Sequence, residues 1–262
     1  MKILSIILLI FAVFGLSELH SFGLDLYSSP VVISLGEIYL LSNAPETSFY
    51  QPAKSVEGIS LTHSNPHGFR ELNVFQLSSQ IKAVGELFYT GVFVLDNDYI
   101  SDKIFYLGYT KSINQLSLGA NVRYYHQSIE NYHSLDAFTV NLGIIWQNRN
   151  ITHGLTYSNL SHTSKNGIYL PTLYKYEFMI SPIEKTNFAL SLEKEKDFDL
   201  RYAFAVSREI ASIFSINTGF ITNPNQFSVG VMVKMNDFDV SIGVRTHSQL
   251  GYTQAIGVVY RI

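Results

Sequence analysis

The sequence contains no cysteine, a single tryptophan and few charged residues. Without cysteine, the chain can form no disulfide bond, use no thiolate chemistry and carry no lipoprotein-type export signal. Lys, Arg, Asp and Glu make up 15% of its 262 residues, whereas soluble domains carry about 25%. The formal net charge of −3 provides no basic surface. A nucleic-acid partner is therefore not expected.

A long apolar helix is missing as well. The apolar run from Ile3 to Leu16 follows Met1-Lys2 and precedes small residues, and it is shorter than the roughly 20 apolar residues that a membrane-spanning helix needs. These features predict a secretory signal peptide over residues 1–23. No later run is long enough to cross a bilayer as a helix. If the mature chain enters a membrane, it crosses as strands.

Alternation of apolar and polar residues is what the sequence has in abundance. In the last segment, Leu250 to Ile262, apolar side chains occupy every second position, and the positions between them are small or polar. This pattern is typical of a strand with lipid on one side and a wet lumen on the other. The pattern recurs about fourteen times. We predict strands at residues 57–64, 71–81, 84–95, 102–111, 114–127, 135–147, 149–158, 173–181, 185–194, 197–207, 211–221, 225–235, 236–246 and 249–262.

The connections between these strands alternate in length. They are tight at residues 111–114 and 235–237 and longer at residues 129–133 and 161–171. In outer-membrane barrels the short turns face the periplasm and the long loops face outward. The sequence therefore predicts an all-β protein of the outer membrane, with residues 57–262 forming a transmembrane antiparallel β-barrel of about fourteen strands. A soluble β-sandwich is the alternative.

The period of two also assigns the two faces of the barrel. One face carries Ser, Thr, Asn, Gly and Ala with few charges, as expected in a confined lumen and not on a sandwich surface in bulk water. We expect lipid contacts at Leu116, Leu118, Val122, Phe138, Leu142, Phe227, Val229, Val240 and Val258. We expect a charged network of both signs in the lumen, formed by Arg123, Glu177, Arg201, Asp239 and Arg245.

Residues 24–56 precede the barrel and are long enough to fold into its lumen. We interpret them as a plug, with a periplasmic linker as the alternative. The motif expected to seat the plug in the lumen is Tyr50, Gln51, Pro52 and Ala53. Glycines within the strands, among them Gly119, Gly143 and Gly243, would let such a plug approach the wall closely.

The order of motifs in the plug segment resembles that of a known family. An apolar strand with Gly36 and a small polar stretch lead into Phe49-Tyr50-Gln51-Pro52-Ala53-Lys54 and then the strand at residues 58–63. This order resembles the N-terminal pattern of the PorV/PorQ-like outer-membrane proteins, which belong with the FadL-like fatty-acid transporter barrels and carry aromatic-Asn-Pro-Ala-Gly. The closing hairpin, with Thr246-His247-Ser248-Gln249-Leu250-Gly251-Tyr252-Thr253, is similar to the family's ending. This chain has Gln51 in place of Asn and Lys54 in place of Gly.

The resemblance implies two roles. PorV/PorQ-like members are adaptors of type IX secretion in Bacteroidota-type bacteria, with secretion-apparatus proteins or exported cargo as partners. FadL-like members pass hydrophobic molecules. From the sequence we favour a non-enzymatic adaptor that contacts its partner through the outer loop at residues 161–171, where Tyr169 and Leu170 are the apolar contacts.

A lipid hydrolase is a further alternative. His162-Thr163-Ser164-Lys165-Asn166-Gly167 resembles the His-x-Ser-Asn-Gly signature of outer-membrane phospholipases, in which His is the base for the Ser nucleophile. Lys165 interrupts the signature and shifts Asn166 to the other face of a strand. No histidine set has zinc spacing, and no phosphate-binding loop is present. Neither metal nor cofactor is expected.

Overall fold

The computed structural model describes residues 29–69, 71–97, 99–131, 134–160, 170–196 and 198–262, and the backbone of residues 162–165. The predicted signal peptide and Tyr169 lie outside this part of the chain. Within it, no helix is long and apolar enough to cross a membrane.

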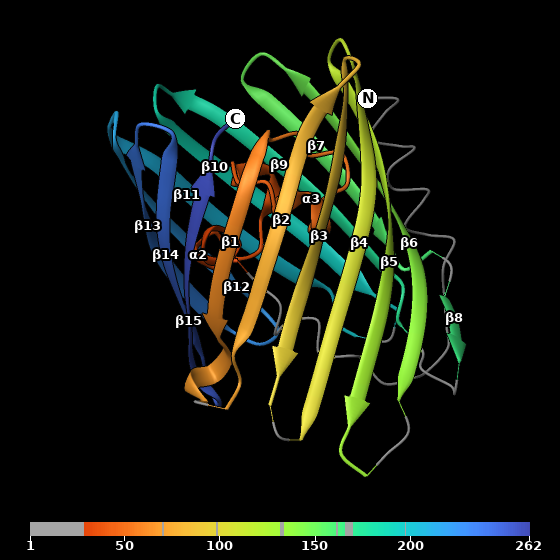
Figure 1. The fold of residues 1–262 in the computed structure, drawn as a ribbon. Helices are drawn as coiled ribbons and strands as arrows, with labels where there is room; N and C mark the ends of the chain where they lie inside the picture. The colour runs from red at the N-terminus through yellow and green to blue at the C-terminus, as the bar shows by residue number, and fades with distance from the viewer. Residues whose placement is uncertain are drawn as a thin grey trace.

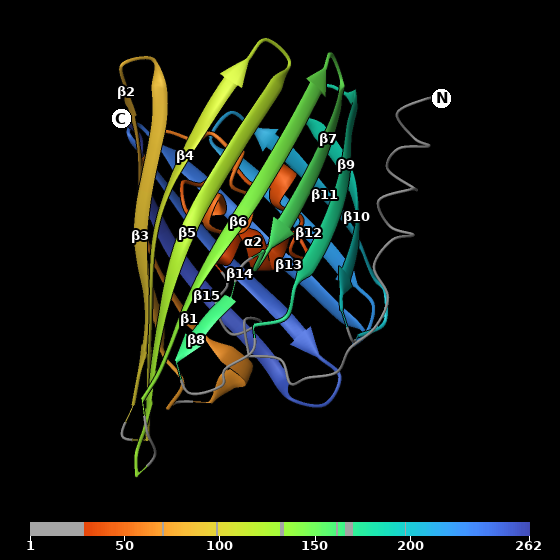
Figure 2. The same cartoon turned by 90° about the vertical axis from the view of Figure 1, so that its right-hand side faces the viewer.

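Fourteen antiparallel strands form a closed barrel (Figure 1, Figure 2). Each strand of the ring pairs with the next one along the chain, and β7 pairs with β9 because β8 is not part of the ring. The pairings of β1 with β15 and of β5 with β6 close the ring. The strands of the ring are β1 (Gly58–Asn65), β2 (Val74–Ala83), β3 (Glu86–Asp96), β4 (Ile100–Ile113), β5 (Leu116–Ile129), β6 (Leu135–Asn148), β7 (Ile151–Ser158), β9 (Leu173–Ile183), β10 (Thr186–Glu195), β11 (Arg201–Ala211), β12 (Phe214–Ile221), β13 (Gln226–Met235), β14 (Phe238–His247) and β15 (Gly251–Tyr260).

The fold predicted from the sequence is thus confirmed, and each predicted strand has its counterpart. The largest difference is in β11, predicted at residues 197–207 and found at Arg201–Ala211. The predicted strand began too early because Phe198 and Leu200 alternate with polar residues, although both precede β11. A β-sandwich is excluded, since one continuous sheet closes on itself.

All two-residue turns lie at one end of the barrel, which we call the turn end, together with the start of β1 and the end of β15 (Figure 1). In the β2–β3 turn, both Val84 and Gly85 have positive φ angles, as the type I′ turns that match the strand twist require. The opposite end, the loop end, carries the longer connections. The predicted alternation of loop lengths is therefore found.

Side chains alternate between the two faces of the wall. Of the nine predicted lipid-facing residues, seven are exposed and Leu116 and Val240 are half-buried. Their neighbours in sequence point inward, where most side chains are small or polar. An outward apolar belt around a polar interior is the pattern of outer-membrane barrels.

One strand was not predicted. β8 (His162–Lys165) pairs with residues 136–139 of β6, and β7 pairs with residues 142–148 of the same strand. β8 therefore continues the path of β7 along β6, after β7 ends at Ser158 (Figure 2). We predicted an outer loop for this segment, because His-Thr-Ser-Lys shows no apolar alternation.

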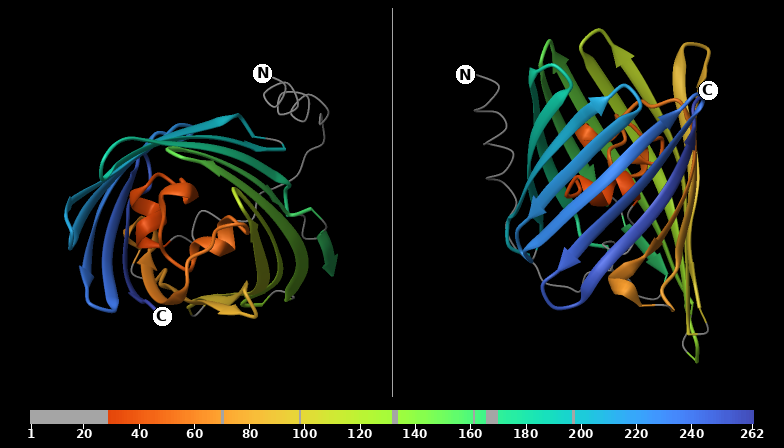
Figure 3. Two further views of the ribbon diagram at one scale, coloured as in Figure 1. Left: turned by 90° about the horizontal axis from the view of Figure 1, so that it is seen from above. Right: turned by 90° about the vertical axis from the view of Figure 1, so that its left-hand side faces the viewer.

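Residues 29–56 lie inside the barrel (Figure 3). They form α2 (Pro30–Ser34), the 3-10 turn η2 (Tyr39–Leu41) and α3 (Thr47–Tyr50); a further 3-10 turn, η3 (Pro66–Gly68), follows β1. The apolar strand implied around Gly36 by the resemblance is wrong. Ser29 accepts a hydrogen bond from the Val32 amide at 3.3 Å and Pro30 occupies the first turn, a combination that starts a helix.

Candidate functional site in the plugged lumen

The first part of the plug packs against a row of glycines on β12, β13 and β14. A Cβ atom at Gly243 would lie 2.2 Å from the Pro30 carbonyl oxygen, and one at Gly230 would lie 2.4 Å from the Ser34 Cβ. Any larger residue at either position would therefore push α2 away from the wall. Glycine thus permits the close approach between the plug and the wall.

The second part of the plug, which includes the predicted motif, docks against β3 to β7. The Pro52 carbonyl accepts hydrogen bonds from Tyr89 Oη at 3.1 Å and Thr110 Oγ1 at 2.7 Å. Gln51 Nε2 donates to Thr156 Oγ1 at 2.8 Å. A Cβ at Gly119 would lie 2.0 Å from the Pro52 oxygen.

The other two motif residues, Tyr50 and Ala53, contact the plug as well as wall residues Phe93 and Ile145. The Tyr50 ring stacks on the Tyr39 ring with 5.0 Å between centroids. The amide of Ala53, which is buried, donates to Gln51 Oε1 at 3.2 Å. All four predicted motif residues therefore lie inside the lumen, and Gln51 itself makes side-chain contacts with the wall.

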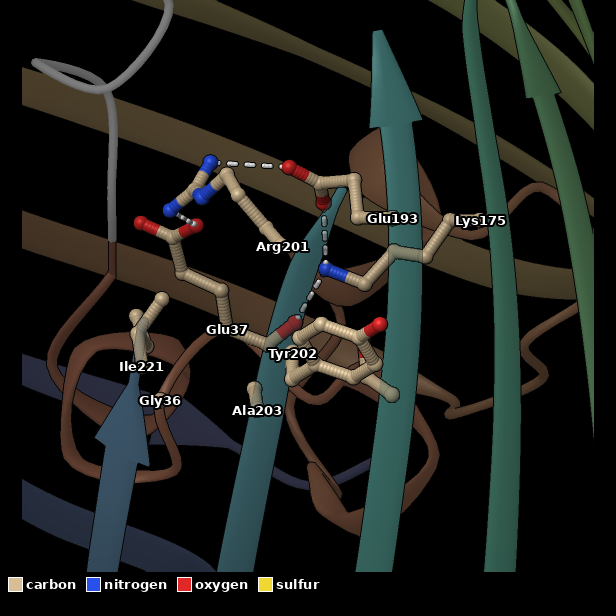
Figure 4. A pocket seen from close by; sticks show the side chains of 9 residues that line it. Gly36, Glu37, Lys175, Glu193, Arg201, Tyr202, Ala203 and Ile221 are labelled. Carbon is tan, nitrogen blue, oxygen red and sulfur yellow. Dashed lines mark hydrogen bonds and ion pairs between the residues drawn. The ribbon is translucent and has the colours of Figure 1, made fainter. Parts of the chain in front are cut away.

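A cluster of charges joins the plug to the wall, and its centre is Glu37 (Figure 4). The Glu37 carboxylate pairs with Arg201 at 3.2 Å and with Arg245. Arg201 also pairs with Glu193 at 2.8 Å, and Lys175 bridges Glu193 at 2.9 Å and the Glu37 carbonyl at 2.7 Å. Glu37, Lys175, Glu193 and Arg201 border a small cavity with about 170 Å³ of empty volume, including its open mouth.

The ionisation of Glu37 is set by two opposing effects. Burial raises the pKa of its carboxyl, but Arg245, Arg201 and Lys175 together outweigh burial and bring the pKa to about 2. Glu37 is therefore an anion at neutral pH. It also has a left-handed backbone, with φ 61°.

The predicted lumen network is only partly one unit. Arg201 and Arg245 meet at Glu37, whereas Glu177 accepts a hydrogen bond from the Tyr39 amide at 2.6 Å. Asp239 pairs with Arg261 at 3.2 Å, near the turn end. Arg123 lies elsewhere in the lumen, as described below.

Glu37 organises this network and was not among the residues that we predicted from the sequence. One signal was present: Glu37 is the only charged residue between Asp25 and Glu46. A lone charge in an apolar segment destined for burial needs a partner.

The wall opposite the charge cluster is apolar on its inner face. Inward-pointing residues of β3 are Leu87, Tyr89, Phe93 and Leu95, all buried. This agrees with the apolar residues on both faces of that segment in the sequence. Three of them belong to a larger cluster that also includes neighbouring strands, the plug and the segment before β9. Its buried members are Phe49, Val74, Tyr89, Phe93, Leu95, Ile104, Tyr106, Tyr125, Ala137 and Leu170.

Leu170 belongs to this cluster and is completely buried. Its predicted role as an exposed partner contact in an outer loop does not fit that position, and Tyr169 lies outside the described residues. An apolar residue in this segment was interpreted as a contact for another protein, but it fills the barrel's own interior.

Arg123 reaches this apolar side from β5. Its guanidinium carbon lies 3.8 Å from the centroid of the Phe49 ring. It donates hydrogen bonds to the Phe49 carbonyl and, at 3.3 Å, to Tyr125 Oη. No carboxylate among the described residues lies within 4 Å of it. Arg123 is thus a plug contact separate from the Glu37 cluster.

The proposed hydrolase residues lie on β8. The backbone of His162 pairs with Thr139 and that of Ser164 with Ala137, and both partner residues face the lumen. The side chains of His162 and Ser164 lie outside the described part. Among described residues, no three His, Asp or Glu side chains are arranged to hold a metal ion.

Comparisons with known proteins find similarity at the level of structure. No family model matches the chain, and no curated protein matches it by sequence. A deletion mutant of the TodX monoaromatic hydrocarbon channel superposes with a TM-score of 0.70 at 8% identity, covering 92% of this chain and 100% of that one. A Pseudomonas aeruginosa FadL homologue gives 0.57 at 10% identity, covering 89% and 98%. This barrel has the FadL-type fold.

The Pseudomonas putida toluene transporter TodX gives a TM-score of 0.56 at 9% identity, with coverage of 94% of this chain and 98% of that one. At such identities the likeness concerns the fold. It agrees with an outer-membrane location and with the FadL-like part of the resemblance seen in the sequence. The narrower likeness to PorV/PorQ-like proteins is not found among these structures.

Proposed function

We propose that this protein passes small hydrophobic molecules across the outer membrane through a barrel that its own N-terminal segment closes. The observation that carries the proposal is the apolar inner face of β3, where Phe93 and Leu95 lie in the lumen. The interior of a water-filled porin is polar. An apolar lining inside the wall gives a hydrophobic molecule a favourable surface.

The plug decides how passage can occur. Phe49, Leu35 and Ile38 are buried in the lumen, so the state described by the structure is closed. A solute must therefore displace part of the plug. The short helices α2 and α3 are held mainly by their contacts with the wall, because they have few internal hydrogen bonds. Helices of this length are not stable alone, so displacement would unfold them at little cost.

The neighbouring structures support this choice over the secretion adaptor favoured from the sequence. The FadL homologue and TodX share the fold of this chain. TodX is named both as a toluene transporter and as a monoaromatic hydrocarbon channel. The adaptor hypothesis placed its apolar partner contact at Tyr169 and Leu170, and Leu170 is buried. Binding to secretion-apparatus proteins or cargo stays a prediction from the sequence.

The test is the initial rate of toluene uptake by cells that express the full chain, with uptake of a polar disaccharide measured in parallel. We expect faster toluene uptake and unchanged disaccharide uptake. Leu95→Asn should lower toluene uptake severalfold, because the amide makes the inner lining polar. Val94→Asn, on the outer face of the same strand, is the matched control.

Two results would contradict the proposal. Toluene uptake equal to that of cells without the protein would remove the transport function, and equal effects of the two substitutions would remove the role of the lining. Co-purification of a secretion component with no toluene uptake would favour the adaptor.

A further inference from the structure

We propose that Arg123 and Asn121 form a carboxylate-binding site, that Phe49 of the plug is its built-in occupant, and that the displacing ligand is a 3-arylpropanoate. Such a ligand has an aromatic ring joined to a carboxylate through two carbons. The inference rests on the proposed function and names a substrate class for it.

Arg123 lacks the counter-ion that a buried guanidinium requires. It is 3% exposed, and within the described part its Nε has no hydrogen-bond partner and no carboxylate lies within ion-pair distance. Its other contacts are the Phe49 carbonyl, the Phe49 ring and the Tyr125 hydroxyl. A buried charge without an opposite charge is costly. An anionic ligand would supply that missing charge.

Asn121 provides a second donor whose orientation is fixed by a chain of hydrogen bonds. The Asn159 backbone amide can only donate, and it donates to Asn141 Oδ1 at 2.9 Å. The Asn141 nitrogen therefore faces Asn121 and donates to its Oδ1 at 2.6 Å.

The Asn121 nitrogen is in consequence directed at the plug. It donates to the Ser48 carbonyl at 3.1 Å and to the Phe49 carbonyl at 3.3 Å. Two donors thus converge on main-chain oxygens of the plug, in an arrangement that the two oxygens of a carboxylate would also satisfy.

Phe49 occupies the site with both its ring and its carbonyl. The ring centroid lies 4.5 Å from that of Phe93 and 5.2 Å from that of Tyr106, and the guanidinium covers the ring face. Ring, Cβ, Cα and carbonyl together are a 3-phenylpropanoyl group. A free 3-phenylpropanoate could place its ring among the same aromatic side chains and add the negative charge that the carbonyl lacks.

Titration calorimetry on the purified full-length protein in amphipol, with 3-phenylpropanoate as the probe, tests the proposal. We expect it to bind more tightly than octanoate, which lacks the ring, and than propylbenzene, which lacks the carboxylate. Arg123→Met should weaken 3-phenylpropanoate binding by about ten- to a hundredfold, the range for losing a hydrogen bond to a charged group. Arg123→Lys should retain part of the affinity. The exposed Arg208→Met is the matched control.

Phe49→Ala removes the internal competitor and should tighten 3-phenylpropanoate binding. Heat-modifiable gel migration shows whether each variant has a folded barrel, and the Arg123 pair decides the question if the Phe49 variant does not fold. Equal binding to wild type and Arg123→Met, or weaker binding after Phe49→Ala, would overturn the proposal.

The binding test of the carboxylate site and the uptake test of the transport proposal can fail independently. Faster toluene uptake with no 3-phenylpropanoate binding would overturn the carboxylate site alone. Arg123-dependent binding without hydrocarbon uptake would support the site and contradict the hydrocarbon channel.

Discussion

At the scale of single residues, Glu37 is the strongest link between plug and wall. It connects the segment between α2 and η2 to β11 and β14 through Arg201 and Arg245. Both guanidinium groups are largely withdrawn from solvent. Removing the carboxylate would break both of these ion pairs, although Arg201 would keep its pair with Glu193. Breaking a buried ion pair by removing one partner costs more than the pair itself contributes.

We therefore expect Glu37→Gln to destabilise plug docking by about 3–5 kcal/mol. Because the chain has no cysteine, Ala44→Cys in the buried plug gives a clean reporter. The urea concentration at which this thiol becomes reactive should fall in the Glu37 variant. Glu86→Gln, which breaks the exposed pair with Lys111, should change it little. Unchanged reactivity in the Glu37 variant would show that the cluster does not hold the plug.

Acid should release the plug through the same residue. The pKa of Glu37 is about 2 in the folded state and about 4.3 in an unfolded chain. The stability that ionised Glu37 gives to plug docking is therefore complete above its unfolded pKa. It is lost as pH falls through its folded pKa of about 2. Reactivity of the Ala44→Cys thiol towards a pyridyl disulfide, which works in acid, should rise only in that window. Glu37→Gln should abolish the rise, and release beginning near neutral pH would contradict this assignment.

At the scale of elements, the docking of the plug depends on glycines in the strands. Gly119→Ala would place a Cβ against the Pro52 carbonyl, and overpacking of this kind costs about 1–3 kcal/mol. An Ala53→Cys thiol should then react faster, by roughly ten- to a hundredfold, since about 1.4 kcal/mol corresponds to a factor of ten. Ala120→Val, on the outer face of β5, is the control. Equal rates in the two variants would argue against a docked plug.

The elements also show what the sequence could and could not predict. The strands were predictable because lipid outside and small polar side chains inside impose a period of two along each strand. α2 was not, because a five-residue helix is held by its surroundings, although Ser29 and Pro30 gave a local signal for its start. The partners of Glu37 come from strands far apart in the chain, so no spacing could identify them.

At the scale of the whole molecule, we expect the apolar outer face of the wall to lie in lipid. Leu142→Arg should destabilise the barrel by about 2–4 kcal/mol if the residue lies near the bilayer midplane, measured as urea-induced unfolding in vesicles. The adjacent Asn141 faces the lumen, but it is fully buried in a hydrogen-bond chain and is no neutral site for Arg. The half-buried, lumen-facing Ser207→Arg is the better comparison, and equal losses at residues 142 and 207 would contradict the assignment of faces.

The central claim is that the N-terminal segment closes a barrel that would otherwise be open. Single-channel conductance in planar bilayers tests it directly, by comparing the full-length protein with a variant lacking residues 29–56. We predict no steady ion current through the full-length protein and stable open channels in the deletion variant, with its barrel verified by heat-modifiable migration. Steady current through the full-length protein, or a folded deletion variant that does not conduct, would contradict the account.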